Sequence, residues 1–366
     1  MLDFSDNHLL NSLLDIVNNI EIEPNFCICH PNYQPFALPD RLAERFQKNS
    51  VELQRKYFTL LLRNFIYGIY YNGLLQNVLA INAKPVNCLP HKSIENNSIL
   101  EIDWQFYEQL HESNHGTGYF DSGWQVLRRE PDGSLAVSKG GLTLHIESDS
   151  HLEAIVQSAK VGELLNIWMP KNRLQNGCYV AVGNVAQKLG SNPDDDLGEG
   201  RIYLNLTPSG AIAMMESLTM QLNDAVIPFN FQVPYNPSAY GRYDSGVLYF
   251  QRHDYPAVRE VLQAVYAQHK SHFHPEIPLF TKFLASGLSL AEEPTKKFVS
   301  RESFGINRCQ LVANALFEAW QKGYNSTEER MRTICQHFAS FGIDLQRPYL
   351  NPSSKDIYYP LGTCKK

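Results

Sequence analysis

The sequence predicts an α+β protein: a helical N-terminal lobe packed on a mixed, largely antiparallel sheet lobe with C-terminal helices. Three observations support this fold class. Apolar residues recur at helical spacing through most of the first third of the chain. Short segments that alternate apolar and polar residues follow, separated by turn residues. Helical spacing then returns near the C-terminus. A chain of 366 residues suits two coupled lobes, which we place at 1–118 and 119–366.

The N-terminal lobe is expected to contain three helices joined by loops. Residues 7–19 place their leucines on one face at helical spacing. A loop that contains several prolines follows. Residues 51–79 give the strongest helical pattern, and they are apolar over so much of the helix surface that we expect a central position. Residues 102–112 form the third helix.

The second lobe begins with strands and ends with helices. Pro131-Asp132-Gly133 is a good hairpin turn between strands at 123–129 and 135–139. The segment 192–200, NPDDDLGEG, reads as a solvated loop. Further strands are expected at 142–146, 164–169, 178–183, 201–206, 229–233 and 245–250, and helices at 208–223, 255–269, 307–323 and 327–341. The last helix opens with the cap-like residues Ser326-Thr327-Glu328-Glu329.

Composition excludes several classes of protein. The formal net charge of −6 disfavours nucleic acid as a partner, because duplex binders usually carry a basic excess. No apolar run approaches the roughly 20 residues that a membrane span needs, and the N-terminus lacks the pattern of a signal peptide. Seven widely spaced cysteines do not suggest a disulfide framework. We therefore expect a cytoplasmic protein without membrane partners.

Standard cofactor motifs are missing from the sequence. It has no phosphate-binding loop, no dinucleotide fingerprint and no nucleophile elbow, so we expect no cofactor. Cys27-Ile28-Cys29-His30 hints at metal, but adjacent ligands at that spacing strain a tetrahedral site and no second pair follows. His272-Phe273-His274 precedes Pro275, where solvated side chains are the commoner outcome. The sequence therefore predicts no metal site.

Positive side chains within strand-like or loop segments are the most informative feature. Burying such a charge without a partner is costly. Taken singly, most of them are best explained by snorkelling or ion pairing, and Arg242 beside Asp244 is the clearest example. Arg201 alternates in phase with Tyr203, so the two share one sheet face. Taken jointly, these positive residues predict a site for an anionic group. Phosphate is a suitable anion because the planar guanidinium of arginine can donate two parallel hydrogen bonds to it. The residues are Lys139, His145, Lys171, Arg173, Arg201, Arg242, Lys282 and Arg308.

Several of these segments resemble a known family. The C-terminal pair PEIPLFTKFLASGLSLAEEP and ESFGINRCQLVANAL carries the most specific resemblance, and FDSGWQVLRRE, SKGGLTLHIE, RIYLNLTPSGA and GRYDSGVLYF add weaker support. Together they resemble the HopA-type effector family from about Tyr67 to Leu316. That family includes type III secretion effectors of plant pathogens. It also includes proteins that look like the lyase component of class V lanthipeptide synthetases, and this biosynthetic branch is the better interpretation because no secretion feature is visible.

The resemblance implies a phosphoserine and phosphothreonine lyase. Its substrate would be a ribosomal precursor peptide phosphorylated by a separate peptide kinase, and β-elimination would leave dehydroalanine or dehydrobutyrine. The chemistry needs a base for the α-proton and an acid and cations for the departing phosphate. We assign His145 as the acid and Lys171 as the base, with Lys139 as the competing base. Phosphate binding falls to Arg201, Arg242 and Arg308, with Lys282 as helper and Tyr203 as an orienting residue.

One departure from the family pattern leaves a second function open. Effector phosphothreonine lyases carry a Lys-x-His pair on a strand, whereas this sequence has Thr143-Leu144-His145. The alternative is a non-catalytic, effector-like protein or peptide-binding module. Convergence of the cations on one cleft would favour the enzyme, and their dispersal over the surface would favour binding.

Overall fold

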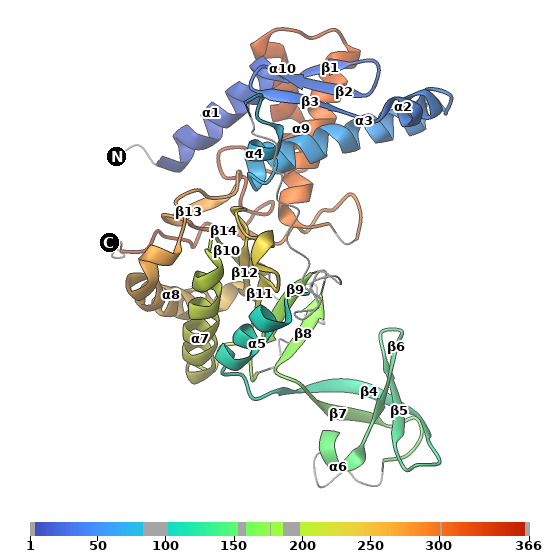
Figure 1. The fold of residues 1–366 in the computed structure, drawn as a ribbon, viewed down its shortest axis with the longest axis vertical. Coiled ribbons are helices and arrows are strands. Elements are labelled where there is room, and N and C mark those ends of the chain that lie inside the picture. The colour runs from blue at the N-terminus through green and yellow to red at the C-terminus, as the bar shows by residue number, and fades with distance from the viewer. Residues whose placement is uncertain are drawn as a thin grey trace.

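The computed structural model describes residues 4–82, 102–152, 159–175, 177–185, 198–300 and 302–362. Its fold is α+β, as the sequence predicts. Figure 1 shows a helical layer at the top, a seven-stranded sheet in the middle and a small four-stranded sheet at the bottom. Every strand pair in the described ranges is antiparallel. No helix in those ranges is long and apolar enough to cross a membrane.

The N-terminal region combines helices with a small sheet. Its elements are α1 (Phe4–Asn19), β1 (Glu21–Glu23), β2 (Cys27–His30), β3 (Tyr33–Ala37), α2 (Asp40–Gln47), α3 (Val51–Ile66), η1 (Tyr67–Tyr71), α4 (Gln76–Leu79) and α5 (Trp104–Ser113). Two predictions are wrong here. The expected proline-containing loop forms three short strands, and the helix expected over 51–79 ends in a π-helical turn, after which Gly73 takes a left-handed φ of 72°.

The seven-stranded sheet has the order β13-β14-β10-β12-β11-β9-β8. Its apolar face includes Ile202, Leu248 and Phe231 and is covered by α7 and α8 (Figure 1). Because side chains alternate along a strand, Arg201 and Tyr203 share the opposite face, as predicted. The strands are β8 (Asn172–Gln175), β9 (Cys178–Val182), β10 (Glu199–Leu204), β11 (Phe229–Pro234), β12 (Gly246–Gln251), β13 (Lys282–Ala285) and β14 (Leu288–Glu292), with α7 at Pro208–Asp224, α8 at Tyr255–His269, and short turns η4 (Pro237–Ala239), η5 (Arg252–Asp254) and η6 (Lys270–His272).

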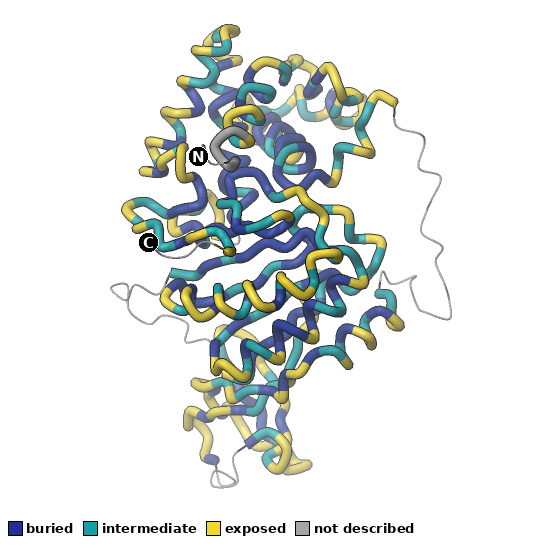
Figure 2. The backbone as a smooth tube through the Cα atoms, turned by 90° about the vertical axis from the view of Figure 1, so that its left-hand side faces the viewer, coloured by how far each residue is buried: buried dark blue, intermediate teal, exposed yellow. Residues whose placement is uncertain are grey.

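The four-stranded sheet has a core of its own. Trp124, Leu135, Val137 and Ile167 form a buried cluster separate from the main core. The sheet has the order β6-β5-β4-β7 and extends away from the rest of the fold (Figures 1 and 2). Its elements are β4 (Tyr119–Arg129), β5 (Leu135–Lys139), β6 (Leu142–Ile146), α6 (Ser148–His151) and β7 (Leu164–Met169). The domain boundary between residues 118 and 119 stays a prediction.

The C-terminal helices pack back on the N-terminal region. Helix α9 (Phe304–Gln321) lies against both α3 and α10 (Thr327–Ser340). The expected capping box at the start of α10 is confirmed: Ser326 and Glu329 each bond to the other's backbone. Residues 192–197 of the predicted loop lie outside the described residues, and residues 199–200 begin β10.

Candidate functional site

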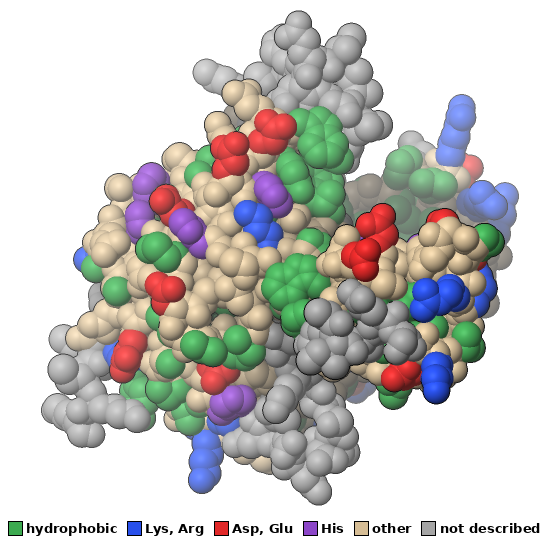
Figure 3. Space-filling model, turned by 90° about the horizontal axis from the view of Figure 1, so that it is seen from below, with side chains coloured by type: hydrophobic (Ala, Val, Ile, Leu, Met, Phe, Trp, Pro, Cys, Tyr) green, Lys and Arg blue, Asp and Glu red, His purple; other side chains and the backbone are tan. Residues whose placement is uncertain are grey.

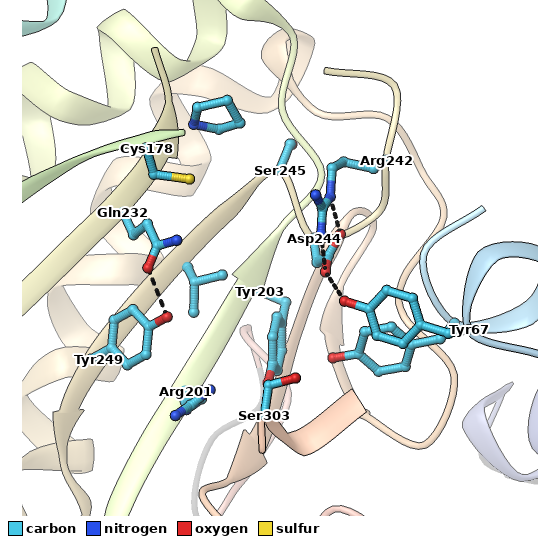
Figure 4. Close-up of a pocket in the computed structure, with 13 residues that line it drawn as sticks. Tyr67, Cys178, Arg201, Tyr203, Gln232, Arg242, Asp244, Ser245, Tyr249 and Ser303 are labelled. Atoms are coloured by element: carbon cyan, nitrogen blue, oxygen red, sulfur yellow. Dashed lines mark hydrogen bonds and ion pairs between the residues drawn. The ribbon is translucent and has the colours of Figure 1, made fainter. Parts of the chain in front are cut away.

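A polar cavity of about 160 Å³ opens where the uncovered face of the seven-stranded sheet meets η1 and the start of α9 (Figure 4). Strand β10 contributes Arg201 and Tyr203, which the sequence had placed on one face. The remaining walls come from β9, β11, β12, η1 and the loop before β12. The described lining residues are Tyr67, Tyr71, Cys178, Arg201, Tyr203, Gln232, Pro234, Arg242, Asp244, Ser245, Val247, Tyr249 and Ser303. We call this cavity the tyrosine–arginine pocket.

Arg242 is held on one side of the pocket by a bidentate ion pair with Asp244. Nε lies 2.5 Å from Oδ1, and Nη2 lies 2.8 Å from Oδ2. The Tyr67 hydroxyl donates to the same carboxylate at 3.2 Å. Burial opposes the charge of Arg242, but Asp244 raises the pKa of the guanidinium, which therefore stays protonated. The ion pair expected from the sequence is confirmed, and it leaves Nη1 of Arg242 without a partner among the described residues.

Arg201 lies on a different side of the pocket (Figure 4). Its Nε is 3.3 Å from Glu199 and its Nη2 is 2.5 Å from Glu293. The guanidinium also stacks on Tyr249, 4.9 Å from the ring centroid. Burial opposes this charge as well, yet Tyr203 and Glu293 raise the pKa of Arg201. In the part of the chain that the structure describes, Nη1 of Arg201 has no partner. Both arginines are thus immobilised by carboxylates while each retains donor capacity.

Tyrosine hydroxyls supply the other polar groups of the pocket. Tyr71 and Tyr203 meet edge to face, with ring centroids 6.3 Å apart. Tyr249 donates to Gln232 at 2.9 Å. Burial raises the pKa of Tyr71 and Tyr203 well above the ordinary value, and that of Tyr249 to about 12. These hydroxyls remain protonated at neutral pH, so they serve as hydrogen-bond donors rather than bases.

His145 and Lys139 lie away from this pocket, on the four-stranded sheet. The His145 side chain on β6 is 57% exposed, and its Nδ1 is 3.6 Å from Glu130. Lys139 on β5 is 2.6 Å from Asp121. On the face seen in Figure 3, the described basic and acidic side chains are interspersed. The structure therefore does not bring the predicted acid and the competing base together with Arg201 and Arg242.

Lys171 follows β7 and bonds to main-chain carbonyls. Its Nζ donates to His111 O at 3.0 Å and to Asn114 O at 2.8 Å. Burial lowers the pKa of this amine, which is the direction that a catalytic lysine needs. However, Lys171 does not line the tyrosine–arginine pocket. Arg173 on β8 bonds to Asn230 at 3.1 Å and is also outside the lining.

Lys282 and Arg308 are engaged by the protein itself. Lys282 Nζ lies 2.6 Å from Asp356 and 3.1 Å from the Tyr349 hydroxyl. Arg308 on α9 is 1% exposed. Its guanidinium donates to the carbonyls of Pro348 and Leu350 and stacks on a neighbouring phenylalanine ring. Burial lowers the pKa of Arg308 to about 10. Through these contacts both side chains hold the C-terminal segment around residues 348–356 against the rest of the fold.

Sequence reasoning found only part of the aromatic wall of the pocket: Tyr203 was a predicted site residue, whereas Tyr67 and Tyr71 were not. Tyr67 and Tyr71 read as buried helix residues, whereas their rings stack with centroids 4.9 Å apart and line the pocket from the π-helical turn η1. The nearest signal in the sequence was the density of tyrosines in the segment YGIYY. Cys178 and Gln232 gave no signal, because both lie within ordinary strand patterns.

Fold and site together define an α+β protein with a buried anion-compatible pocket on an antiparallel sheet. Residues 169–350 match the HopA1 effector protein family. This segment contains every sheet strand that lines the pocket, and the expected resemblance to that effector family is confirmed at this level. No curated protein sequence matches the chain.

Two solved structures of Pseudomonas syringae effector proteins are similar to the chain. The effector from pathovar tomato strain DC3000 is 16% identical, with a TM-score of 0.43, and the alignment covers 82% of this chain and 96% of that one. The effector from pathovar syringae strain 61 is 13% identical, with a TM-score of 0.44, and coverage of 95% and 98%.

Proposed function

We propose that this chain is an effector-like, non-catalytic binding protein that holds a peptide through an anionic side chain, with the tyrosine–arginine pocket as the recognition site. The observation that carries the proposal is the immobilisation of two guanidiniums at one cavity. Arg201 and Arg242 are each held by carboxylates, and among the described residues the Nη1 of each has no partner. Preordered donors bind an anion at a lower entropic cost than mobile lysines do.

The size of the pocket favours a side chain as the ligand. Its 160 Å³ is the share of about five water molecules in the liquid, whereas whole small-molecule ligands fill about 300 Å³ or more. A phosphorylated serine or threonine fits these dimensions. It also offers several acceptor oxygens to the two guanidiniums and to the tyrosine hydroxyls. A separate peptide kinase would supply this modification.

The lining supports binding more than catalysis. Among the described residues it includes no histidine and no lysine. Asp244 is occupied by Arg242 and Tyr67. The buried tyrosines hold their protons, and burial also raises the pKa of the Cys178 thiol. A strong base next to a bound peptide is therefore missing from this set, and elimination needs one.

The test is equilibrium binding of a phosphoserine peptide, its unphosphorylated form and a glutamate-substituted form. We expect the phosphopeptide to bind at least tenfold more tightly than the unphosphorylated peptide, and Arg201→Gln and Arg242→Gln to remove most of that preference. Arg128→Gln, which alters an exposed arginine on the four-stranded sheet, is the matched control. Equal affinity for all three peptides would refute the proposal.

A phosphoserine and phosphothreonine lyase acting on a precursor peptide is the second candidate. The protonated hydroxyls of Tyr71 and Tyr203, which line the pocket together with Arg201, favour it, because a tyrosine can protonate a departing phosphate. In the elimination, a base removes the α-proton, that electron pair forms the Cα–Cβ double bond, and the Cβ–O bond breaks. Mass spectrometry decides the matter: elimination leaves a product about 18 Da below the unmodified peptide, whereas binding leaves the phosphopeptide intact.

A further inference from the structure

The side chains of Glu23, Cys27 and Cys29 converge on one face of the N-terminal hairpin. Strands β1 and β2 pair with Glu23 opposite Cys27, and side chains two apart on a strand point the same way. The two Sγ atoms lie 3.7 Å apart, and Cys29 Sγ lies 3.6 Å from the Glu23 carboxylate. All three ligand atoms fall within 4.8 Å of one another.

These distances match the edges of a tetrahedral zinc site. With Zn–S bonds of about 2.3 Å and Zn–O bonds of about 2.0–2.2 Å, tetrahedral geometry separates two ligand atoms by roughly 3.5–3.8 Å. The separation of the two Sγ atoms and that of Cys29 Sγ from the Glu23 carboxylate fall in that range, and Cys27 Sγ lies within 4.8 Å of the same carboxylate. The sequence spacing alone argued against a metal. The hairpin changes that conclusion, because it brings in Glu23 from the neighbouring strand as a third ligand.

A disulfide is the competing use of two neighbouring thiols, and strand geometry disfavours it. Two residues apart on an extended strand, the Cα atoms are about 6.7 Å from each other, at the upper end of the range that a disulfide spans. Both cysteines are free thiols in the structure.

We propose that Glu23, Cys27 and Cys29 bind Zn²⁺, with the fourth coordination position open to water. Sulfur ligands exclude hard cations such as Mg²⁺ and Ca²⁺ and favour a thiophilic d¹⁰ ion. The site would fasten β1 to β2 beside Phe26, whose ring stacks on Phe58 of α3 at 4.3 Å. Its effect is therefore to fix the hairpin against the N-terminal helices, independently of the tyrosine–arginine pocket.

Metal binding by the reduced, chelator-treated full chain tests the site. Titration with Zn²⁺ under non-denaturing mass spectrometry should give one tightly held ion per chain. Co²⁺ should produce thiolate-to-metal charge-transfer absorption. Cys27→Ser and Cys29→Ser should each abolish both signals, and Glu23→Gln should weaken Zn²⁺ binding at least about tenfold, because even outer-sphere partners matter on that scale.

The exposed Cys335 supplies the matched control, since Cys335→Ser should bind Zn²⁺ as the parent does. Thermal unfolding adds a second readout: saturating Zn²⁺ should raise the Tm of the parent chain but not that of Cys29→Ser. Glu23 is exposed, so Glu23→Gln is expected to fold even if a cysteine variant does not. Absence of stoichiometric Zn²⁺ on the reduced parent chain, or unchanged binding by both cysteine variants, would overturn the proposal.

Discussion

Arg242 and Asp244, which are separated by a single residue in the sequence, form a bidentate ion pair between the guanidinium and the carboxylate. The Asp244 side chain is 7% exposed and that of Arg242 is 30% exposed, so the acid is the buried partner and the arginine faces the pocket. A ligand anion would have to share Arg242 with this carboxylate. The pair therefore sets both the geometry and the affinity of the pocket for anions.

The first prediction concerns that competition. Asp244→Asn removes a negative charge beside Arg242, so phosphopeptide affinity should rise about fivefold, equivalent to about 1 kcal/mol. Stability should fall by about 1–3 kcal/mol, since a buried partner of an arginine is lost. Asp356→Asn is the matched control, because Asp356 pairs with Lys282 outside the pocket lining. Peptide titrations would contradict the prediction if Asp244→Asn weakened binding as much as Arg242→Gln does.

The second prediction tests whether Arg308 stabilises the fold or binds phosphate. Arg308→Leu leaves the carbonyls of Pro348 and Leu350 without their donor, so unfolding in urea should become easier by about 3 kcal/mol. The folded fraction should still bind phosphopeptide with parental affinity, because Arg308 does not line the pocket. Arg347→Leu, at an exposed arginine, should change stability by less than about 0.5 kcal/mol. A stable Arg308→Leu variant that has lost binding would restore the phosphate-binding role.

Periodic elements could be predicted from the sequence, and short ones could not. Helices with full apolar stripes and the capping box at Ser326 follow from local patterns that tertiary contacts reinforce. The strands at 21–37 and 282–292 are three to five residues long and lie next to prolines or turns, so they hold too few positions for an alternating pattern. Their pairing depends on partners elsewhere in the chain.

The sequence predicted which site residues lie together only where they belong to the same strand. Arg201 and Tyr203 share a face because alternation along β10 requires it. Whether His145 lies near Arg201 and Tyr203 depends on the position of the four-stranded sheet relative to the seven-stranded sheet. No local sequence pattern predicts that position. Tyr67 and Tyr71 face the pocket from a π-helical turn, and which neighbours their shared face meets is set by tertiary packing rather than by the local pattern.

The third prediction uses the contact between Gly305 and Tyr71. A Cβ added at Gly305 would lie 2.3 Å from the Tyr71 ring, so Gly305→Ala must displace the ring from the wall of the pocket. We expect phosphopeptide affinity to fall at least tenfold and stability to fall by about 1–3 kcal/mol from overpacking. Gly323→Ala is not a fair control, because Gly323 has a positive φ of 71°.

Ala315→Gly, on the same helix, provides a better comparison. Its side chain lies in the main core and outside the pocket lining, so the variant should lose stability but keep its affinity for the peptide. Parental phosphopeptide binding by Gly305→Ala would show that the Tyr71 ring does not shape the site.

The last prediction is a pH dependence of stability that arises at His30. The side chain is fully buried, and the backbone N–H of Asn32 donates to its Nδ1 at 3.1 Å, so the ring is neutral with its proton on Nε2, facing Tyr70. Burial lowers the pKa of His30 below its ordinary 6.5, and Asp15 only partly opposes this shift. Below about pH 6.5 the unfolded chain therefore takes up the proton more readily than the folded chain.

The contribution of His30 to the free energy of unfolding should therefore be independent of pH above pH 6.5. Below that value, this contribution should decrease as the pH falls. His30→Asn retains an acceptor near Asn32 without a titrating ring, so urea unfolding at pH 7.5 and 5.5 should show a smaller difference for this variant than for the parent. His253→Asn, at a side chain that is 58% exposed, should keep the parental difference. Equal pH dependence in parent and His30→Asn would place the titrating group elsewhere, with His8 and His111 next in line because burial lowers their pKa values too.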